Sequence, residues 1–229
     1  MTQVQQTVII VAGGRGERMQ TNVAKQFLEI NTLPVLMHTI GIFHRFNSLM
    51  QIIVALPPDQ IKYWEALCKK HAFTIDHKVI AGGATRFETV LKGLAIAPHD
   101  GIIAIHDGVR PLVSQATISR CFDEATMYGT AIPVLPPVES IREIRGDESV
   151  AVNRNNYRMV QTPQVFQASI IHKAYESGFS PEFTDDASVV EKLGVQIKLV
   201  EGNPENIKIT SPIDLKLAAV LLSDINDIQ

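Results

Sequence analysis

The sequence predicts an α/β protein whose single Rossmann-like domain contains a three-layer, mostly parallel, doubly wound sheet. Apolar segments without polar alternation, at 7–11, 51–56 and 101–105, are typical of parallel strands that are covered on both faces. Segments with helical periodicity lie between them, which favours repeated βαβ units. We therefore expect a single domain over residues 1–229, with helices on both faces of the sheet.

The elements follow from these patterns in chain order. Strands are predicted at Thr7–Val11, Gln51–Leu56, His77–Ile80, Gly101–Ile105, Gly129–Val134 and Val195–Val200. Helices are predicted at about 34–46, 59–70, 85–97, 115–128, 167–177 and 185–193. Thr85 and Glu88 have the spacing of a capping box at the start of one helix. Ser211 before Pro212 marks the start of the last helix.

Residues 138–152 interrupt the α/β alternation. Two short strands flank a turn at Gly146-Asp147, which predicts a β-hairpin within an arm at about 137–155. An isolated two-stranded ribbon is only marginally stable in water, so it must pack on something. We expect a partner subunit in a homodimer; the alternative is a hairpin that folds back on its own domain.

Composition excludes several classes of protein. The net charge of −3 gives no general attraction to nucleic acid or to anionic membranes. No segment approaches the roughly 20 apolar residues of a membrane span, and the first residues lack the features of a signal peptide. Cys68 and Cys121 show no metal or redox spacing, so we expect buried thiols and a cytoplasmic protein.

The loop after the first strand is the clearest functional signal. Gly13, Gly14 and Gly16 flank Arg15, and Arg18 and Lys25 follow. Exposed backbone N–H groups together with fixed cations favour a polyphosphate ligand. The spacing is neither Walker A nor a dinucleotide fingerprint, since Met19 occupies the place of the third glycine.

Two more loops follow strands of the same predicted sheet. Gly82-Gly83 precede Arg86, and His106-Asp107 precede Arg110. Ligands of α/β sheets bind outside the carboxyl ends of the strands, so we expect all three loops to face one cleft. A carboxylate such as Asp107 suits a Mg²⁺ ion that bridges phosphate oxygens; the alternative is an ion pair with Arg110. His106 is interpreted as a packed residue rather than a base.

Two C-terminal segments are less specific. Residues 206–210 alternate, which predicts a short strand with Ile207 and Ile209 on one face and Lys208 on the polar face. Residues 184–188 have the sequence of an ordinary helix cap.

The ordered set of motifs resembles the 2-C-methyl-D-erythritol 4-phosphate cytidylyltransferase family from about Val8 to Leu221. The motifs that carry the resemblance are Gly14–Met19, Lys25-Gln26-Phe27, Gly82-Gly83 with Arg86, His106-Asp107 with Arg110-Pro111, Thr162-Pro163-Gln164, Thr184–Ser188, and Gly202 with Asn206–Thr210. The first motif alone is typical of nucleotidyltransferases in general.

The resemblance implies transfer of CMP from CTP to 2-C-methyl-D-erythritol 4-phosphate, with release of pyrophosphate, in the non-mevalonate isoprenoid pathway. It implies catalytic roles for Arg18, Lys25 and Lys208, and a Mg²⁺ ion or another divalent cation at Asp107. Nucleotide binding falls to Ala12, Gly13, Gly14, Arg15, Gly16, Gly82, Gly83, Arg86 and Thr89. Substrate binding falls to Asp107, Arg110, Thr162 and Thr184, together with Ser140 and Arg154 from the partner subunit's arm.

The chain departs from the family pattern in small residues. Gly13 stands where alanine is common, Gly108-Val109 replace two alanines, Ala84 replaces an acidic residue and Ser140 replaces a threonine.

Three alternative functions compete with the cytidylyltransferase interpretation. A sister cytidylyltransferase for ribitol 5-phosphate has the same chemistry. A regulatory module without catalysis would not require Arg18, Lys25, Asp107 and Lys208 together. An NAD-dependent dehydrogenase is disfavoured by the missing glycine.

Overall fold

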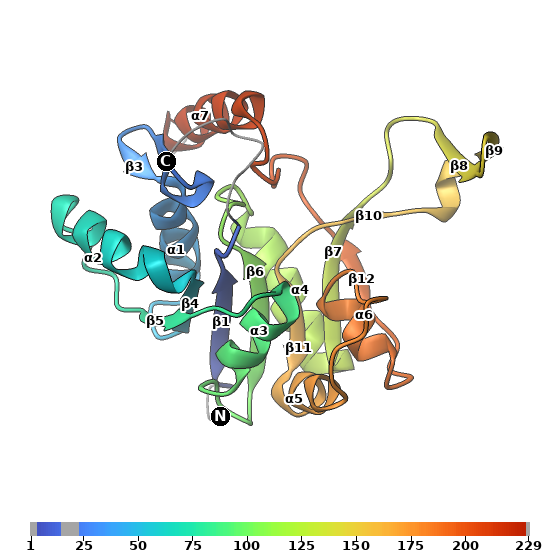
Figure 1. The fold of residues 1–229 in the computed structure, drawn as a ribbon, viewed down its shortest axis with the longest axis horizontal. Helices are drawn as coiled ribbons and strands as arrows, with labels where there is room; N and C mark the ends of the chain where they lie inside the picture. The colour runs from blue at the N-terminus through green and yellow to red at the C-terminus, as the bar shows by residue number, and fades with distance from the viewer. Residues whose placement is uncertain (1–3, 15–22, 228–229) are drawn as a thin grey trace.

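The computed structural model describes residues 4–14 and 23–227, and it confirms the predicted α/β class (Figure 1). The central sheet has the order β10-β7-β11-β6-β1-β4-β5, with β12 beside β7. Its strands are β1 (Gln6–Val11), β4 (Gln51–Leu56), β5 (Lys78–Ala81), β6 (Ile102–Asp107), β7 (Thr130–Leu135), β10 (Met159–Val160), β11 (Gln164–Gln167) and β12 (Leu199–Glu201). The helices are α1 (Val35–Phe46), α2 (Ile61–Lys70), α3 (Arg86–Leu94), α4 (Gln115–Tyr128), α5 (Ala168–Glu176), α6 (Asp186–Glu191) and α7 (Pro212–Asp227).

The parallel half of the sheet places three strand ends together. β1 pairs in parallel with β4 and with β6, and β5 extends the sheet beyond β4 in the same direction. Val11 at the end of β1 is in register with Ala55 on one side and with Asp107 on the other. The segments that follow these strands therefore begin at one edge of the sheet.

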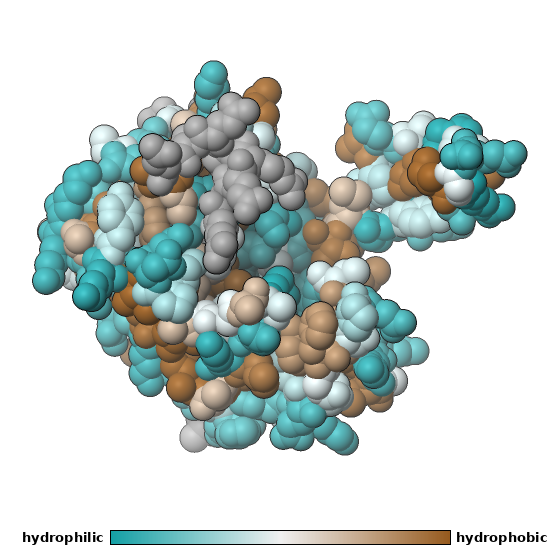
Figure 2. Space-filling model, viewed as in Figure 1, coloured by the Kyte–Doolittle hydropathy of each residue, from teal (hydrophilic) through white to brown (hydrophobic). Residues whose placement is uncertain are grey.

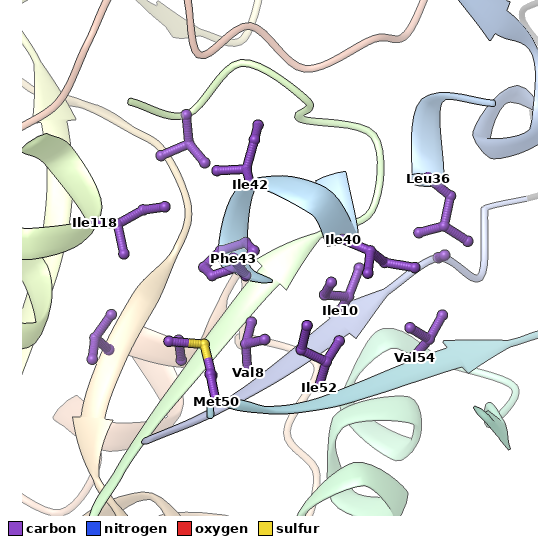
Figure 3. Close-up of a cluster of buried hydrophobic side chains, with 14 of the residues drawn as sticks. Val8, Ile10, Leu36, Ile40, Ile42, Phe43, Met50, Ile52, Val54 and Ile118 are labelled. Atoms are coloured by element: carbon purple, nitrogen blue, oxygen red, sulfur yellow. The ribbon is translucent and has the colours of Figure 1, made fainter. Parts of the chain in front are cut away.

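Helices cover both faces of the sheet because its central strands are apolar on both sides. Val8 and Ile10 of β1 pack with α1, α2 and α4 on one face, whereas Ile9 packs with α3, α5 and α6 on the other. Figure 3 shows Ile10 and Ile52 beneath Ile40 and Phe43 of α1. The two apolar layers fix the position of the strand ends that carry the polar loops.

The structure corrects the sequence-based elements at three places. β11 was not predicted, and it runs antiparallel between β6 and β7. The strand expected at Val195–Val200 is reduced to β12, because the preceding residues make only isolated hydrogen bonds to β7. Residues 206–210 form no strand, and Asn206, which the alternation placed on the polar face with Lys208, is fully buried.

Two elements lie outside the main sheet. A small pair, β2 (Glu29–Ile30) and β3 (Leu33–Pro34), precedes α1 and contacts α7. The predicted hairpin is confirmed as β8 (Ile141–Arg145) and β9 (Glu148–Val152), joined through Gly146 at a φ of +60°. In the part of the chain that the structure describes, short 3₁₀ helices occupy Lys25–Phe27, Pro58–Gln60 and Arg154–Asn156.

The hairpin projects away from the body of the molecule (Figure 1). Within the described chain, its strands pair only with each other, and the arm is not folded back on its own domain (Figure 1). Hydrophobic side chains are exposed on this arm (Figure 2), with Val138 at 82% and Ile144 at 72%. None of the helices described is both long enough and apolar enough to cross a membrane.

Candidate functional site

A pocket of about 290 Å³ lies at the carboxyl edge of the parallel strands. The three loops predicted from the sequence all reach it, together with residue 208 from the C-terminal segment. Its described lining consists of Val11, Ala12, Gly13, Gly14, Lys25, Gln26, Gly83, Ala84, Thr85, Arg86, Thr89, Asp107, Val109 and Lys208. Polar and cationic groups from distant parts of the chain thus share one cavity.

The loop after β1 brings a lysine close to its backbone. A Cβ atom added at Gly14 would lie 3.1 Å from Cε of Lys25, so this side chain lies directly against the glycine. Lys25 begins a 3₁₀ turn that Phe27 anchors in the core. Arg15, Gly16 and Arg18, which the sequence places in the same loop, lie outside the described residues.

The opposite wall is the loop before α3. Thr89 supports this loop from below: its hydroxyl accepts a hydrogen bond from Gly83 N–H at 3.0 Å and donates to the carbonyl of Thr85 at 2.8 Å. Thr85 is the N-cap residue, and its hydroxyl accepts from the N–H of Glu88 as predicted. The carboxylate of Glu88 reaches one residue further back than a capping box requires, to the N–H of Ala84.

Asp107 is the electrostatic centre of the pocket. Its Oδ2 lies 3.0 Å from Nε of Arg110 and 3.1 Å from Nζ of Lys208. Burial alone would raise the pKa of Asp107, but the charges of Lys208, Arg110 and Arg86 outweigh burial and hold that pKa well below its usual range. The carboxylate is therefore ionised at neutral pH and binds cations.

Behind Asp107 lies a neutral histidine. The Thr162 hydroxyl accepts from the backbone N–H of Asp107 at 3.1 Å and pairs with Nδ1 of His106 at 3.0 Å. Nε2 of the same ring lies 3.1 Å from the carbonyl oxygen of Arg110, which only accepts, so Nε2 carries the proton. Burial lowers the pKa of His106 to about 4. His106 is thus a packed residue, as predicted, and Thr162 positions Asp107.

Arg86 belongs to a second buried ion pair. Its guanidinium binds both oxygens of Asp186, at 2.8 and 2.5 Å, and Tyr175 donates a hydrogen bond to the same carboxylate at 2.6 Å. Burial opposes the charged form of Arg86, yet Asp186 raises the pKa of this guanidinium above its ordinary value. This pair joins α3 to α6 at the edge of the pocket.

Several predicted site residues lie away from the pocket in the described chain. Gly82 packs behind the pocket lining, and Arg110 reaches the site through Asp107 and the carbonyl of Asn206. Thr184 lines a neighbouring cavity with Phe87 and Phe179. Ser140 is exposed on the arm, and Arg154 at its base donates to the carbonyl of Val138.

The structural roles of two residues of the site, Asp186 and Asn206, were not predicted from the sequence. Asp186 lies in the segment interpreted as a helix cap; Asp185 does cap α6, but Asp186 beside it is fully buried. Asn206 donates to the carbonyl of Thr162 at 2.8 Å from a segment that was predicted as a short alternating strand. Within the described chain, no group of three or more His, Cys, Asp or Glu side chains is arranged to hold a metal ion.

Comparisons with known proteins agree with this geometry. The sequence pattern of the 2-C-methyl-D-erythritol 4-phosphate cytidylyltransferase family matches residues 6–224. A cytidylyltransferase of that name from Bacteroides fragilis is 54% identical over 216 residues, covering 94% of this chain and 99% of the relative. The crystal structure of the Thermus thermophilus enzyme is 31% identical, with a TM-score of 0.79 over 96% of this chain and 99% of its own. A synthase structure from Anaerococcus prevotii has a TM-score of 0.82 at 26% identity, covering 96% of each chain.

Proposed function

The chain belongs to the 2-C-methyl-D-erythritol 4-phosphate cytidylyltransferase family, and from this premise we propose how its pocket carries out the reaction. The enzyme transfers CMP from CTP to 2-C-methyl-D-erythritol 4-phosphate in the non-mevalonate isoprenoid pathway. A phosphate oxygen of the alcohol phosphate attacks the α-phosphorus of CTP and forms a new P–O bond. The bond to the α–β bridging oxygen breaks, and pyrophosphate leaves with its electron pair.

The observation that carries the assignment is the convergence of Lys25, Lys208 and Asp107 with the glycine loops in one pocket. The attacking phosphate is already ionised, so the reaction needs no general base, and the buried His106 beside the site is neutral and fully engaged. Nucleotidyl transfer depends on positioning and on stabilising charge at the α-phosphorus. We assign that stabilisation to Lys25 and Lys208, with Arg18 from the loop outside the described residues.

The nucleotide is proposed to lie along the glycine loops. Backbone groups of residues 12–14 and of Gly83 and Ala84, with Thr89 and Arg86, surround the cytosine and ribose. The triphosphate then extends toward Lys25 and the loop after β1. Arg86 is held by Asp186, so its remaining N–H groups act from a fixed position.

A divalent cation such as Mg²⁺ fits the donor set at Asp107. Arg110 and Lys208 both contact Oδ2 of this carboxylate. Mg²⁺ accepts one or two carboxylates together with phosphate oxygens and water. When bound, the cation would neutralise charge on the triphosphate, and Asp107 would hold it.

We propose that the site for the alcohol phosphate is completed by the arm of a second subunit. Arg110, Thr162 and Thr184 belong to the predicted acceptor side, whereas Ser140 directly precedes β8 and Arg154 directly follows the hairpin. Exposed Val138 and Ile144 on an unsupported hairpin need a covering surface. We infer that the arm packs on a second copy, so that Arg154 serves the partner's pocket. Cys121 is buried as predicted, whereas Cys68 is only half-buried. Both thiols are free, which supports the proposal of a reducing, cytoplasmic location.

The test is pyrophosphate release from CTP with each polyol phosphate in turn. Methylerythritol 4-phosphate should give stoichiometric pyrophosphate and a cytidine diphosphate alcohol, detected by mass spectrometry. Ribitol 5-phosphate should react at least tenfold more slowly. A preference for ribitol 5-phosphate would move the chain to the sister activity, and CTP binding without turnover of either alcohol would indicate the regulatory module.

A further inference from the structure

The loop Gly82–Ala84 is bound to α3 by three side chains. Lys92 donates from Nζ to the carbonyl of Gly82 at 2.8 Å, and Thr89 accepts from Gly83 N–H at 3.0 Å. Glu88 accepts from Ala84 N–H through Oε2 at 2.8 Å. Three side chains of one helix therefore use one polar backbone group on each residue of this loop.

The glycine pair is explained by the same contact. A Cβ atom at Gly83 would lie 2.3 Å from Cβ of Glu88, a distance that no side chain tolerates. At Gly82 it would lie 3.2 Å from Oγ1 of Thr89. The loop thus lies directly on α3, and any shift of this helical face shifts the wall of the pocket.

The remaining polar groups of this wall are all acceptors. The N–H of Gly82 donates to the carbonyl of Leu56 at 2.8 Å, so every N–H of the loop is used by the protein. No described group donates to the carbonyl oxygens of Gly83 and Ala84, and both residues line the pocket. Such a wall suits a base edge that carries a donor, and it penalises one that presents an acceptor.

We propose that Glu88 and Lys92 are positioning residues for nucleotide specificity. Glu88 occupies the N–H of Ala84, and Lys92 anchors the loop through the carbonyl of Gly82. Held in this way, the loop offers the base the carbonyl acceptors of Gly83 and Ala84 and no free N–H. Cytosine has an exocyclic amino donor where uracil has an acceptor, so the arrangement selects CTP over UTP. The inference rests on the proposed placement of the base beside this loop.

Both side chains are exposed, so they are separable from the core. Neither has another hydrogen-bond or ion-pair partner among the described residues. Their replacement removes the loop contact without opening a cavity, which distinguishes them from buried Thr89 beside them.

The experiment measures kcat and KM for CTP and for UTP at saturating methylerythritol 4-phosphate. Lys92→Met and Glu88→Ala should each lower the CTP-to-UTP ratio of kcat/KM by about tenfold, equivalent to about 1.4 kcal/mol. The loss should lie mainly in KM for CTP, with KM for the alcohol phosphate within twofold of wild type. Glu88→Gln and Lys92→Arg keep an acceptor and a donor, and should restore most of the ratio.

Lys173→Met, an exposed lysine of α5, is the matched control and should leave the ratio unchanged. The inference is overturned if Lys92→Met and Glu88→Ala keep the wild-type ratio, or if they reduce kcat equally for both nucleotides. Equal use of CTP and UTP by the wild type would overturn it as well. Absence of turnover by the wild-type enzyme would instead overturn the proposed function, so the two failures are distinguishable.

Discussion

At the residue scale, two buried carboxylates divide the cations around the pocket. Asp107 contacts Arg110 and Lys208, whereas Asp186 takes Arg86. A buried ion pair is costly unless its hydrogen bonds are well satisfied, and both carboxylates meet that condition with more than one partner. These cations are therefore fixed before substrate arrives, which is the preorganisation that charge stabilisation requires.

Lys25 supplies the first residue-scale prediction. Lys25→Ala should lower kcat by a factor on the order of 10² to 10³, the usual scale for losing one preorganised charge-stabilising donor. Steady-state kinetics of the variant test this, with Lys69→Ala on the exposed surface of α2 as the control. Near-normal turnover in a folded Lys25→Ala protein would remove this lysine from the mechanism.

Asp107 supplies the second. Activity should disappear in EDTA and return with Mg²⁺, and Asp107→Asn should raise the Mg²⁺ concentration needed for half-maximal rate by about tenfold or abolish activity. Rates measured over a Mg²⁺ titration check this. Full activity of the wild type in EDTA would contradict the metal assignment.

His106 supplies a prediction about pH. Its pKa of about 4 in the folded protein lies below the value of about 6.5 for an exposed histidine. Folding favours the neutral imidazole. The contribution of His106 to the free energy of unfolding is therefore complete above pH 6.5, and it is lost as the pH falls from 6.5 toward 4. The free energy of unfolding should fall over this window by up to about 3 kcal/mol.

An NMR titration of the imidazole measures the pKa of His106 directly. The ring should remain in the Nε2–H form down to about pH 4, because Thr162 donates to Nδ1 and the Arg110 carbonyl accepts from Nε2. A midpoint near 6.5 would mean that the ring is hydrated and that Thr162 does not donate to Nδ1.

At the element scale, the common position of the loops could be predicted from the sequence because one topological rule governs parallel strands. The carboxyl ends of neighbouring parallel strands share an edge, so the loops after β1, β5 and β6 were correctly expected in one pocket. The Arg86–Asp186 pair was not predictable, because its partners are 100 residues apart and Asp186 lies in an ordinary capping sequence. β11 was missed because its four residues are too few to show a period.

The arm carries the element-scale prediction. Deleting residues 138–152 should give monomers with little activity while the sheet keeps its fold. The dimer proposal has a sharper test in mixing two inactive variants, Lys25→Ala and Arg154→Ala. If the partner's arm completes each pocket, a mixed dimer has one site with both lesions and one site with neither.

The recovery expected from mixing is roughly a quarter of wild-type activity, since about half of randomly exchanged dimers are mixed and each has one intact site of two. Subunit exchange is verified with differently tagged chains. No recovery after verified exchange would mean that Arg154 serves its own chain or that the arm is only structural.

At the scale of the whole molecule, apolar clusters hold in place the segments that carry the polar residues of the pocket. Two apolar layers fix the strand ends, and a third cluster under α7 joins Val109 beside the pocket to Ile209 in the segment that carries Lys208. Ile209 N–H donates to the Val109 carbonyl at 2.9 Å, which places the C-terminal segment against the loop after β6. The C-terminal quarter of the chain is thereby part of the site, which periodicity alone did not reveal.

The location of the nucleotide is tested most directly by a crystal structure with Mg²⁺ and a CTP analogue whose α–β bridging oxygen is replaced by methylene. The triphosphate should lie between Lys25 and Lys208, with the metal on Asp107 and the cytosine amino group against the carbonyls of Gly83 and Ala84. A triphosphate bound outside this pocket, or a base that makes no contact with the Gly83–Ala84 loop, would contradict the account.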